Sequence, residues 1–351
     1  MNRLAILIAA SCIVLTSPSF AEVYELPPDG YDVVGAVSTI TSRYEDTLID
    51  IARRHGVGYQ DIVRANPDVD VWLPGEGTEI VLPTRFVLPP GPRHGIVLNL
   101  AEYRLYYFPL TAPGEAATVM TYPISIGRMD WETPLGVTTV IAKARNPVWY
   151  PPQSVREEHA ADGRALARVV PSGPDNPLGR FAMLLALPGY LIHGTNRPVG
   201  VGMRVTHGCI RMFPEDIQYL IHRVPIDTPV RIVNEPVKIG WFGDELVMEV
   251  HPLLETALPP ASAGMPGDVL SGADPSGDAA AIEAIAEAEN VIVAAAKNPL
   301  TYATEQFIAA TNTHAGRLDW LRVEAMVERS DGIPAAVGRA IKNAATSAAP
   351  R

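Results

Sequence analysis

Cysteine is almost absent from this chain of 351 residues, which contains two. Cys12 lies in an apolar segment at the start of the chain, so Cys209 is the single cysteine of everything that follows. One thiol cannot build a disulfide framework, and in an oxidising compartment it is exposed to wrong pairing and oxidation. A zinc site of the CxxC type is excluded too, and no HExxH spacing occurs. Cys209 therefore needs another explanation than a disulfide or a metal.

Positive charge is also scarce. The 28 Lys and Arg residues are outnumbered by 39 Asp and Glu residues, which gives a formal net charge of -11. Surfaces that bind nucleic acid are usually basic, and docking to an anionic membrane needs basic clusters. The composition therefore argues against both kinds of partner.

The chain lacks an apolar run that spans a bilayer comfortably. The run at residues 4–15 is too short for that, but it follows Arg3 and precedes Ser19-Phe20-Ala21, which resembles a small-x-small cleavage site. We interpret residues 1–21 as a signal peptide, which predicts export to the periplasm and no stable membrane span. Cys12 lies inside the apolar core of this segment, which argues against its being a lipidation site.

Changes in composition divide the remaining chain into successive units. A compact unit at 37–84 precedes a β-rich region at 94–234, a strand extension at 235–256, a linker rich in Pro, Gly, Ser and Ala at 257–277, and a helical tail at 278–351. Hydrophobic periodicity predicts helices at 47–56, 61–67, 214–223, 278–297 and 318–328, and strands at 77–83, 96–100, 104–108, 119–126, 137–143, 228–233 and 246–250.

Two histidines lie close to Cys209 in the sequence. His193-Gly194 precedes the run Thr206-His207-Gly208-Cys209-Ile210-Arg211. A thiol with a pKa of about 8.5 is mostly protonated at neutral pH, so nucleophilic catalysis needs a basic partner. His207 would share a face with Cys209 in an extended segment, and His193 has ample chain to return to the same sulfur. The pattern predicts a cysteine nucleophile with a histidine base, and the order of the two residues excludes a papain-like protease.

This pattern resembles the signature of the L,D-transpeptidase catalytic domain, a histidine-glycine pair followed by Ser/Thr-His-Gly-Cys, an aliphatic residue and arginine. The similarity continues through 99–105, 131–136 and 173–179 and covers about 94–250. The resemblance implies a mainly β catalytic domain of the β-sandwich type that needs no cofactor and no metal. The rival reading is a non-catalytic wall-binding protein, and the intact pair of His193 and Cys209 argues against it.

The resemblance also implies the roles of the site residues. Cys209 would be the nucleophile, His193 the general base, and the backbone carbonyl of Gly194 would orient the imidazole. His207 would support the site. The N–H groups of Gly208 and Cys209 would bind the oxyanion, and Arg211 would either brace the loop or bind a substrate carboxylate.

The implied reaction is acyl transfer on the stem peptides of peptidoglycan. The Cys209 thiolate attacks the carbonyl of the third residue of a tetrapeptide stem, a diamino acid, and releases the terminal D-alanine. The thioester then passes to an amine. Three acceptors stay open: another stem, which gives a 3-3 cross-link; a lysine of an envelope protein; and water. A carbapenem resembles the acyl donor, so such compounds are expected to acylate Cys209.

Residues 37–84 resemble a LysM module, a small βααβ unit that binds glycan strands. The similarity lies in Asp46-Thr47-Leu48, Ile51-Ala52, Ala65-Asn66-Pro67 and Ile80-Val81-Leu82-Pro83, whereas Glu45 stands where a glycine is expected. The resemblance makes Asp46, Thr47 and Asn66 candidate glycan-binding residues. The alternative is a degenerate module that only packs against its neighbour.

Aromatic residues around the motifs allow two interpretations. Trp131, Trp149 and Tyr190 either line a substrate groove or, as aromatics in β-proteins more often do, belong to the core. We interpret the histidines outside the motifs as structural or surface residues: His55, His94, His159, His222, His251 and His314.

Overall fold

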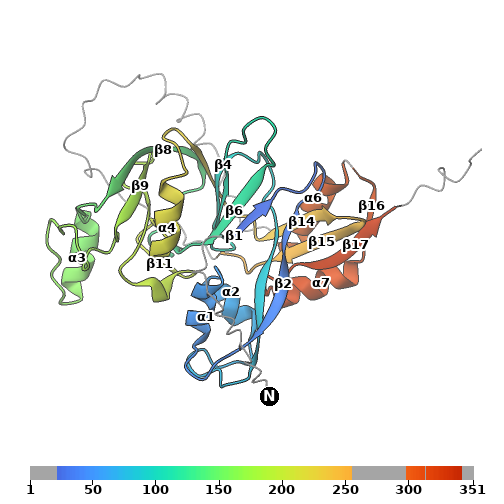
Figure 1. Ribbon diagram of the computed structural model, residues 1–351, viewed down its shortest axis with the longest axis horizontal. Helices are drawn as coiled ribbons and strands as arrows, with labels where there is room; N and C mark the ends of the chain where they lie inside the picture. Colours follow the sequence, from blue (N-terminus) through green and yellow to red (C-terminus); the bar gives the residue numbers. More distant parts are fainter. Residues whose placement is uncertain (1–21, 255–297, 313, 342–351) are drawn as a thin grey trace, which may run out of the picture.

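The computed structural model describes residues 22–254, 298–312 and 314–341. The predicted signal peptide, the predicted linker and the helix predicted at 278–297 lie outside these residues. Within the described residues, no helix combines the length and the apolar character that crossing a membrane requires. Three packed units follow one another along the chain (Figure 1).

The first unit is a small βααβ module in the predicted order of elements. Its strands β2 (Val33–Thr41) and β3 (Glu79–Val87) pair antiparallel along their whole length, and α1 (Leu48–Arg54) and α2 (Tyr59–Ala65) connect them. The apolar faces of both helices pack on β3 around Leu48, Ile51, Ile62, Ile80 and Leu82. The unit begins at Val33, four residues before the predicted boundary. Its assignment as a LysM module stays a prediction.

The second unit is built on one nine-stranded sheet, which makes this region mainly β as predicted. The strands follow one another in the order β1-β6-β5-β4-β13-β8-β9-β10-β12. Their bounds are β1 Glu22–Glu25, β4 Gly95–Asn99, β5 Arg104–Phe108, β6 Thr118–Pro123, β8 Gly136–Arg145, β9 Phe181–Leu185, β10 Leu191–His193, β12 Ile210–Arg211 and β13 Pro229–Val233. A short parallel pair, β7 (Ile126–Gly127) and β11 (Arg204–Thr206), lies beside it.

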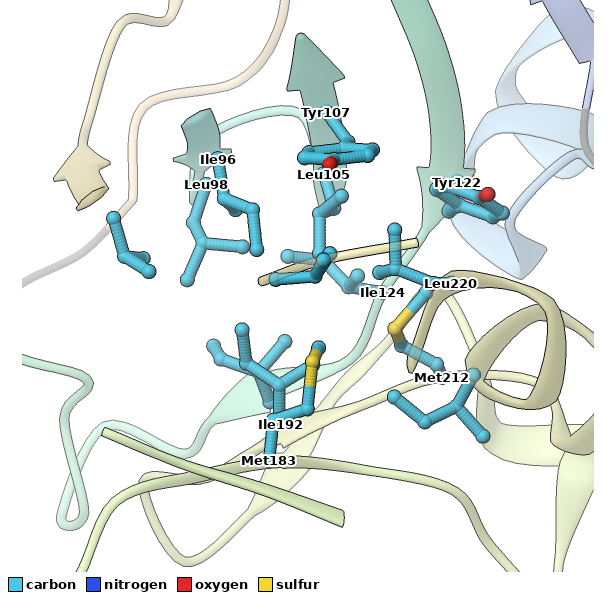
Figure 2. Close-up of a cluster of buried hydrophobic side chains, with 14 of the residues drawn as sticks. Ile96, Leu98, Leu105, Tyr107, Tyr122, Ile124, Met183, Ile192, Met212 and Leu220 are labelled. Carbon is cyan, nitrogen blue, oxygen red and sulfur yellow. The ribbon is translucent and has the colours of Figure 1, made fainter. Parts of the chain in front are cut away.

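The predicted sandwich is one continuous sheet that curls over its own core. Strand β8 pairs with β13 through Gly136–Thr139 and with β9 through Val140–Arg145, and its register with β9 shifts between Val140 and Ala142. A bulge bends a strand, so the two halves of the sheet face each other. Figure 2 shows side chains from both halves meeting in this core, with Leu98, Leu105 and Tyr122 on one side and Met183 and Ile192 on the other.

Three helical segments complete this unit. They are α3 (Gln153–Ala161), the 3-10 turn η1 (Pro198–Gly200) and α4 (Pro214–Ile221). α4 begins with Pro214 and two acidic residues, as predicted, and buries Ile217, Leu220 and Ile221 in the core. α3 was not predicted from the sequence. Val155 is its single buried side chain, so its residues show no apolar repeat at helical spacing.

The third unit contains the predicted strand extension and the tail. Strands β14 (Val237–Phe242) and β15 (Glu245–Val250) lie in the predicted extension, and they form a separate sheet in the order β14-β15-β17-β16. The tail supplies β16 (Gly316–Leu318) and β17 (Ala335–Ala340) as well as the helices α6 (Pro299–Thr311) and α7 (Trp320–Arg329), so it is not purely helical. β17 escaped prediction because its alanines favour helix locally, while its pairing partner lies about ninety residues earlier.

Candidate active site

Two neighbouring strands bring the motif residues together. β10 and β12 are parallel, with Ile192 opposite Ile210 and His193 opposite Arg211. Alternate residues of a strand share a face, so His193 and Arg211 lie on the same face as Cys209, which directly precedes β12. The sequence predicted that His193 and Cys209 meet, and the sheet register places them on adjacent strands.

His193 is held as a neutral base. Its side chain is 5% exposed, and its Nδ1 lies 2.6 Å from the carbonyl oxygen of Gly194. A carbonyl can only accept, so Nδ1 carries the proton and Nε2 is left with a free lone pair. Burial, helped by the positive charge of Arg211, lowers the pKa of His193 to about 3. Gly194 thus makes the contact that its predicted orienting role requires.

Glycine at position 194 lets α4 pack closely on the backbone. A Cβ atom there would lie 3.1 Å from Cγ2 of Ile217 and 3.4 Å from the carbonyl oxygen of Leu178. The backbone N–H of Gly194 also donates to the carbonyl of Phe181. The carbonyl that orients His193 is therefore fixed by both the sheet and the helix.

The Cys209 thiol is half-buried and protonated at neutral pH. It donates a hydrogen bond to the carbonyl oxygen of Gly189 over 3.5 Å. Burial raises the pKa of Cys209 to about 11, although a backbone hydrogen bond with Leu191 and the charge of Arg211 act in the opposite direction. At rest, both the thiol of Cys209 and the imidazole of His193 are thus neutral.

Two threonines fix the turn that carries the thiol. Thr206 donates from its hydroxyl to the carbonyl of Cys209 at 2.6 Å, and Thr133 donates to the carbonyl of Gly208 at 2.8 Å. Gly208 has a φ of 95°, and a Cβ atom there would lie 2.9 Å from the ring of Tyr190. Thr133 belongs to a stretch that resembles the family, but the sequence did not indicate its role, since its partner lies 75 residues away.

His207 belongs to a different contact network from His193. Its Nε2 lies 3.0 Å from a carboxylate oxygen of Glu158 in α3, and its ring stands edge-on to Trp131 with centroids 5.2 Å apart. Arg128 binds the same carboxylate at 2.8 Å. Burial lowers the pKa of His207, and the hydrogen bond to Glu158 opposes this effect. Glu158 was missed because α3 was not predicted.

The three aromatics for which groove and core were both considered are partly exposed: Trp131, Trp149 and Tyr190. Tyr190 also packs against the edge of the core. Trp131 contacts His207, and the hydroxyl of Tyr190 donates to the backbone carbonyl of Glu132 at 3.4 Å. These two rings therefore flank the turn at 206–209, whereas Trp149 pairs with Val170.

Arg211 does not show the contacts expected of a residue that braces the loop. In the part of the chain that the structure describes, its Nε atom is buried and has no hydrogen-bond partner. Burial and the neighbouring charge of Arg197 both lower the pKa of its guanidinium. A brace should have an acceptor in reach, so this arrangement favours the second of the two predicted roles, binding of a carboxylate.

The predicted glycan-binding residues are occupied within the module. Thr47 caps α1 by accepting from the N–H of Asp50 at 3.1 Å. Asn66 is buried and exchanges two hydrogen bonds with the backbone of Val81, at 2.7 and 2.9 Å. Asp46 accepts from the N–H of Arg43 and pairs with Arg54 at 2.7 Å. All three stabilise the module, and glycan binding by them stays a prediction.

A second cluster of ionisable groups lies between the sheet and the C-terminal unit. Glu102, Glu249 and His251 are buried with ligand atoms close enough to share an ion. The ammonium of Lys238 already lies 2.5 Å from Glu102 and 3.1 Å from Glu249. A protein cation thus balances both carboxylates, and the cluster fits an ionic junction between units better than a metal centre.

Comparisons with known proteins place this chain in a family. Residues 93–232 match the family model YkuD, described as the L,D-transpeptidase catalytic domain. A probable L,D-transpeptidase ErfK/SrfK of Escherichia coli K12 is 42% identical over 72% of this chain and 81% of its own length. The probable L,D-transpeptidase YbiS of the same strain is 39% identical over 72% of this chain and 83% of its own. The chain therefore belongs to the L,D-transpeptidase family.

Solved structures give a weaker likeness. The catalytic domain of the E. faecium L,D-transpeptidase, determined by NMR, is 21% identical and aligns with 41% of this chain and 99% of its own, with a TM-score of 0.30.

Proposed function

We propose that this protein is a periplasmic peptidoglycan L,D-transpeptidase with Cys209 as nucleophile and His193 as general base. The observation that carries the proposal is the state of His193. Its proton is tied to the Gly194 carbonyl, its pKa is far below neutral, and it shares a face with the only thiol among the residues after the predicted signal peptide. A neutral base with one fixed lone pair can accept the thiol proton.

The first step joins proton transfer to attack. Cys209 passes its proton to Nε2 of His193 while Sγ bonds to the carbonyl carbon of the third residue of the stem. The carbonyl oxygen takes the negative charge. When the intermediate collapses, the bond to the terminal D-alanine breaks, and His193 returns the proton to the departing amine. A thioester on Cys209 results.

The second step runs the same sequence in reverse with a new nucleophile. The nitrogen of an acceptor amine, or the oxygen of water, attacks the thioester carbonyl, and His193 takes a proton from it. The carbon–sulfur bond then breaks, and the proton returns to the sulfur. The acceptor is a stem amine in a 3-3 cross-link, a lysine of an envelope protein, or water in a carboxypeptidase reaction.

The turn at Gly208 is suited to hold the oxyanion. A trans peptide places its carbonyl and its N–H on opposite sides. The bond from Thr133 fixes the carbonyl of Gly208, so the N–H of Cys209 in the same peptide is also fixed in direction. Donors that are already oriented need no rearrangement as charge develops, which is the main source of such stabilisation. The N–H of Gly208 is the second proposed donor.

Arg211 is proposed to bind a carboxylate of the donor stem. It lies opposite His193 in the sheet register, and its Nε lacks an acceptor among the described residues. Replacing it with Gln should therefore raise KM for a donor with free carboxylates. If the bound carboxylate of the donor is amidated, most of the difference in KM between the wild type and Arg211→Gln should disappear.

His207 is proposed to support the site through α3. Its bond to Glu158 joins the motif turn to that helix, and Arg128 joins the same carboxylate to the loop after β7. The Glu158→Gln variant keeps a hydrogen bond to His207 and loses the charge. It should keep more activity than Glu158→Ala.

Incubation of the purified enzyme with defined muropeptides, followed by mass spectrometry, tests the proposal. A tetrapeptide donor with a second stem or a lysine peptide as acceptor should lose D-alanine and gain the acceptor mass. Cys209→Ala should form no product and keep its fold. A carbapenem should add its mass to the wild type and not to Cys209→Ala. Product formation by Cys209→Ala would defeat the assignment.

Glycan binding is proposed for the βααβ module, on its exposed loops. Tyr44 is 83% exposed, Trp72 60% and Leu73 80%. The two loops that carry them are tied together, because Leu48 donates from its N–H to the carbonyl of Val71 at 2.9 Å. Exposed rings suit stacking on sugars, so Trp72→Ala should weaken sedimentation with purified sacculi. Equal sedimentation of wild type and variant would argue for a module that only packs against its neighbour.

A further inference from the structure

Helix α2 of the module is capped by the catalytic loop. Its N-cap residue is Gly58, which has no side chain to accept from the first N–H groups of the helix. The N–H of Tyr59 donates instead to the carbonyl of Val201 at 3.0 Å, and the N–H of Gln60 donates to the carbonyl of Gly202 at 3.3 Å. Both carbonyls belong to the catalytic unit.

These carbonyls lie at the midpoint of the loop between the two catalytic motifs. The loop begins after His193-Gly194 and ends at Cys209. The module therefore contacts the segment whose two ends carry the proposed base and the proposed nucleophile. In Figure 1, α2 lies next to the region of β11, which is the last part of this loop.

Glycines on both sides allow the two backbones to meet. Gly202 has a φ of 88°, and a Cβ atom there would lie 2.3 Å from the nitrogen of Tyr59. A Cβ atom on Gly58 would lie 3.1 Å from Cα of Gly202. Glycine is the residue that permits such close approach, so this pair is fitted to a tight contact between units.

The contact continues from the loop to Arg211. The carbonyl of Gly200, two residues before Gly202, accepts from the hydroxyl of Ser125 at 2.7 Å. Ser125 exchanges backbone hydrogen bonds with Arg211, at 2.8 and 3.0 Å. A Cβ atom on Gly200 would also lie 3.6 Å from the guanidinium of Arg211. Movement of this part of the loop would therefore shift the surroundings of Arg211.

Two ion pairs tie the same helices to the catalytic unit. Arg53 of α1 binds both carboxylate oxygens of Glu215 in α4, at 2.7 and 2.9 Å. Asp61 of α2 lies 3.4 Å from the buried guanidinium of Arg104 in β5. α4 is also the helix that packs on Gly194. The module is thus attached to α4 and β5 of the catalytic unit as well as to the loop.

We infer that the βααβ module positions the catalytic loop, with Gly58 and Arg53 as positioning residues, in addition to any binding of the wall. The inference rests on the proposed acyl transfer. A tethered binding module would affect activity on insoluble wall alone. A module that holds the loop should also affect turnover of a small soluble donor, chiefly through KM, because Arg211 is proposed to bind that donor.

Full-length variants test this without removing the module. Gly58→Val places a branched side chain against Gly202, and the backbone at Gly58, with φ of -77° and ψ of 159°, accepts valine. Arg53→Glu places like charges against Glu215, and Arg53→Glu with Glu215→Arg restores the pair. Arg54→Glu is the matched control, because it makes the same charge change on the same helix while its partner Asp46 lies inside the module.

The measurements are kcat and KM on a soluble tetrapeptide donor, the alkylation rate of Cys209 by iodoacetamide, and amide exchange at Tyr59 and Gln60. Gly58→Val and Arg53→Glu should speed exchange at the two amides and lower kcat/KM by about 10- to 100-fold, as expected for a misplacement of about 1 Å. Alkylation should not change, since burial sets the thiol pKa. The charge swap should restore KM, and Arg54→Glu should match the wild type.

Three outcomes would overturn the inference. In the first, Gly58→Val and Arg53→Glu speed exchange at the two amides but leave kcat/KM unchanged. In the second, these variants lower kcat/KM although the two amides stay protected from exchange. The third is a charge swap that restores thermal stability and not KM. A wild-type enzyme that transfers no acyl group would instead count against the proposed function, so the two failures are distinguishable.

Discussion

The resting thiol of Cys209 should react slowly with a simple alkylating agent. Its pKa is raised to about 11 by burial, so about 10⁻⁴ of it is thiolate at pH 7. Alkylation needs the thiolate, so its rate should rise about tenfold per pH unit between about pH 6 and 10. With its pKa lowered to about 3, His193 is neutral and holds no ion pair with the sulfur. His193→Ala should thus leave this profile nearly unchanged while slowing acylation by about 10²–10⁴-fold.

The assay follows the mass of the intact protein over time. Iodoacetamide and a carbapenem are compared in the same buffers for wild type and His193→Ala, with Cys209→Ala as the blank. An alkylation rate that levels off below pH 8 in the wild type would refute the reasoning, because it would reveal a thiolate–imidazolium pair at rest. Equal loss of alkylation and acylation in His193→Ala would refute it as well, since the imidazole would then be setting the thiol pKa.

Three further predictions concern buried groups. Lys238→Met leaves two buried carboxylates without their cation and should lower the free energy of unfolding in urea by about 3–5 kcal/mol, whereas the exposed Lys143→Met should change it little. Burial lowers the pKa of His251 to about 4. Below pH 6.5 the unfolded chain therefore binds a proton that the folded protein does not bind, and about 3 kcal/mol of the free energy of unfolding is lost as the pH falls to 4. His251→Leu should therefore flatten the loss of stability on acidification, and an unchanged slope would contradict this. Thr133→Val removes the bond to the Gly208 carbonyl and should slow acylation about tenfold or more, with Thr133→Ser recovering most of the rate; equal rates would exclude a bracing role.

The candidate catalytic residues could be named from the sequence because acyl transfer by a thiol needs particular residue types and because their motif resembles that of the L,D-transpeptidases. A single thiol after the apolar N-terminal segment, a histidine two residues before it and a His-Gly pair upstream left few alternatives for Cys209 and His193. The strands with strong apolar patterns, such as 96–100 and 104–108, were predicted for the same local reason, and β4 and β5 match them within a residue. Helix α4 followed from its proline and acidic residues.

Contacts between distant segments were not predictable in this way. Glu158 meets His207, Thr133 meets Gly208, and β17 completes the sheet begun by β14 and β15, each across a long separation in the chain. No local pattern reports which surfaces will meet. A motif residue can also have a structural role that the sequence does not reveal. Asn66 matches the motif predicted to bind glycan, but its side chain forms hydrogen bonds with the backbone of Val81.

The sequence by itself determined the family of this protein, because a motif of particular residue types at particular spacings carries the resemblance to the L,D-transpeptidases. The tertiary structure decided how the motif residues are held. Burial keeps the Cys209 thiol and the His193 imidazole neutral, and it leaves Nε of Arg211 without a protein acceptor within the described residues. Packing places the N-terminal end of α2, which has no side-chain cap, on the catalytic loop. These properties depend on which groups are excluded from water and which backbones touch, and both are settled only when the whole chain is packed.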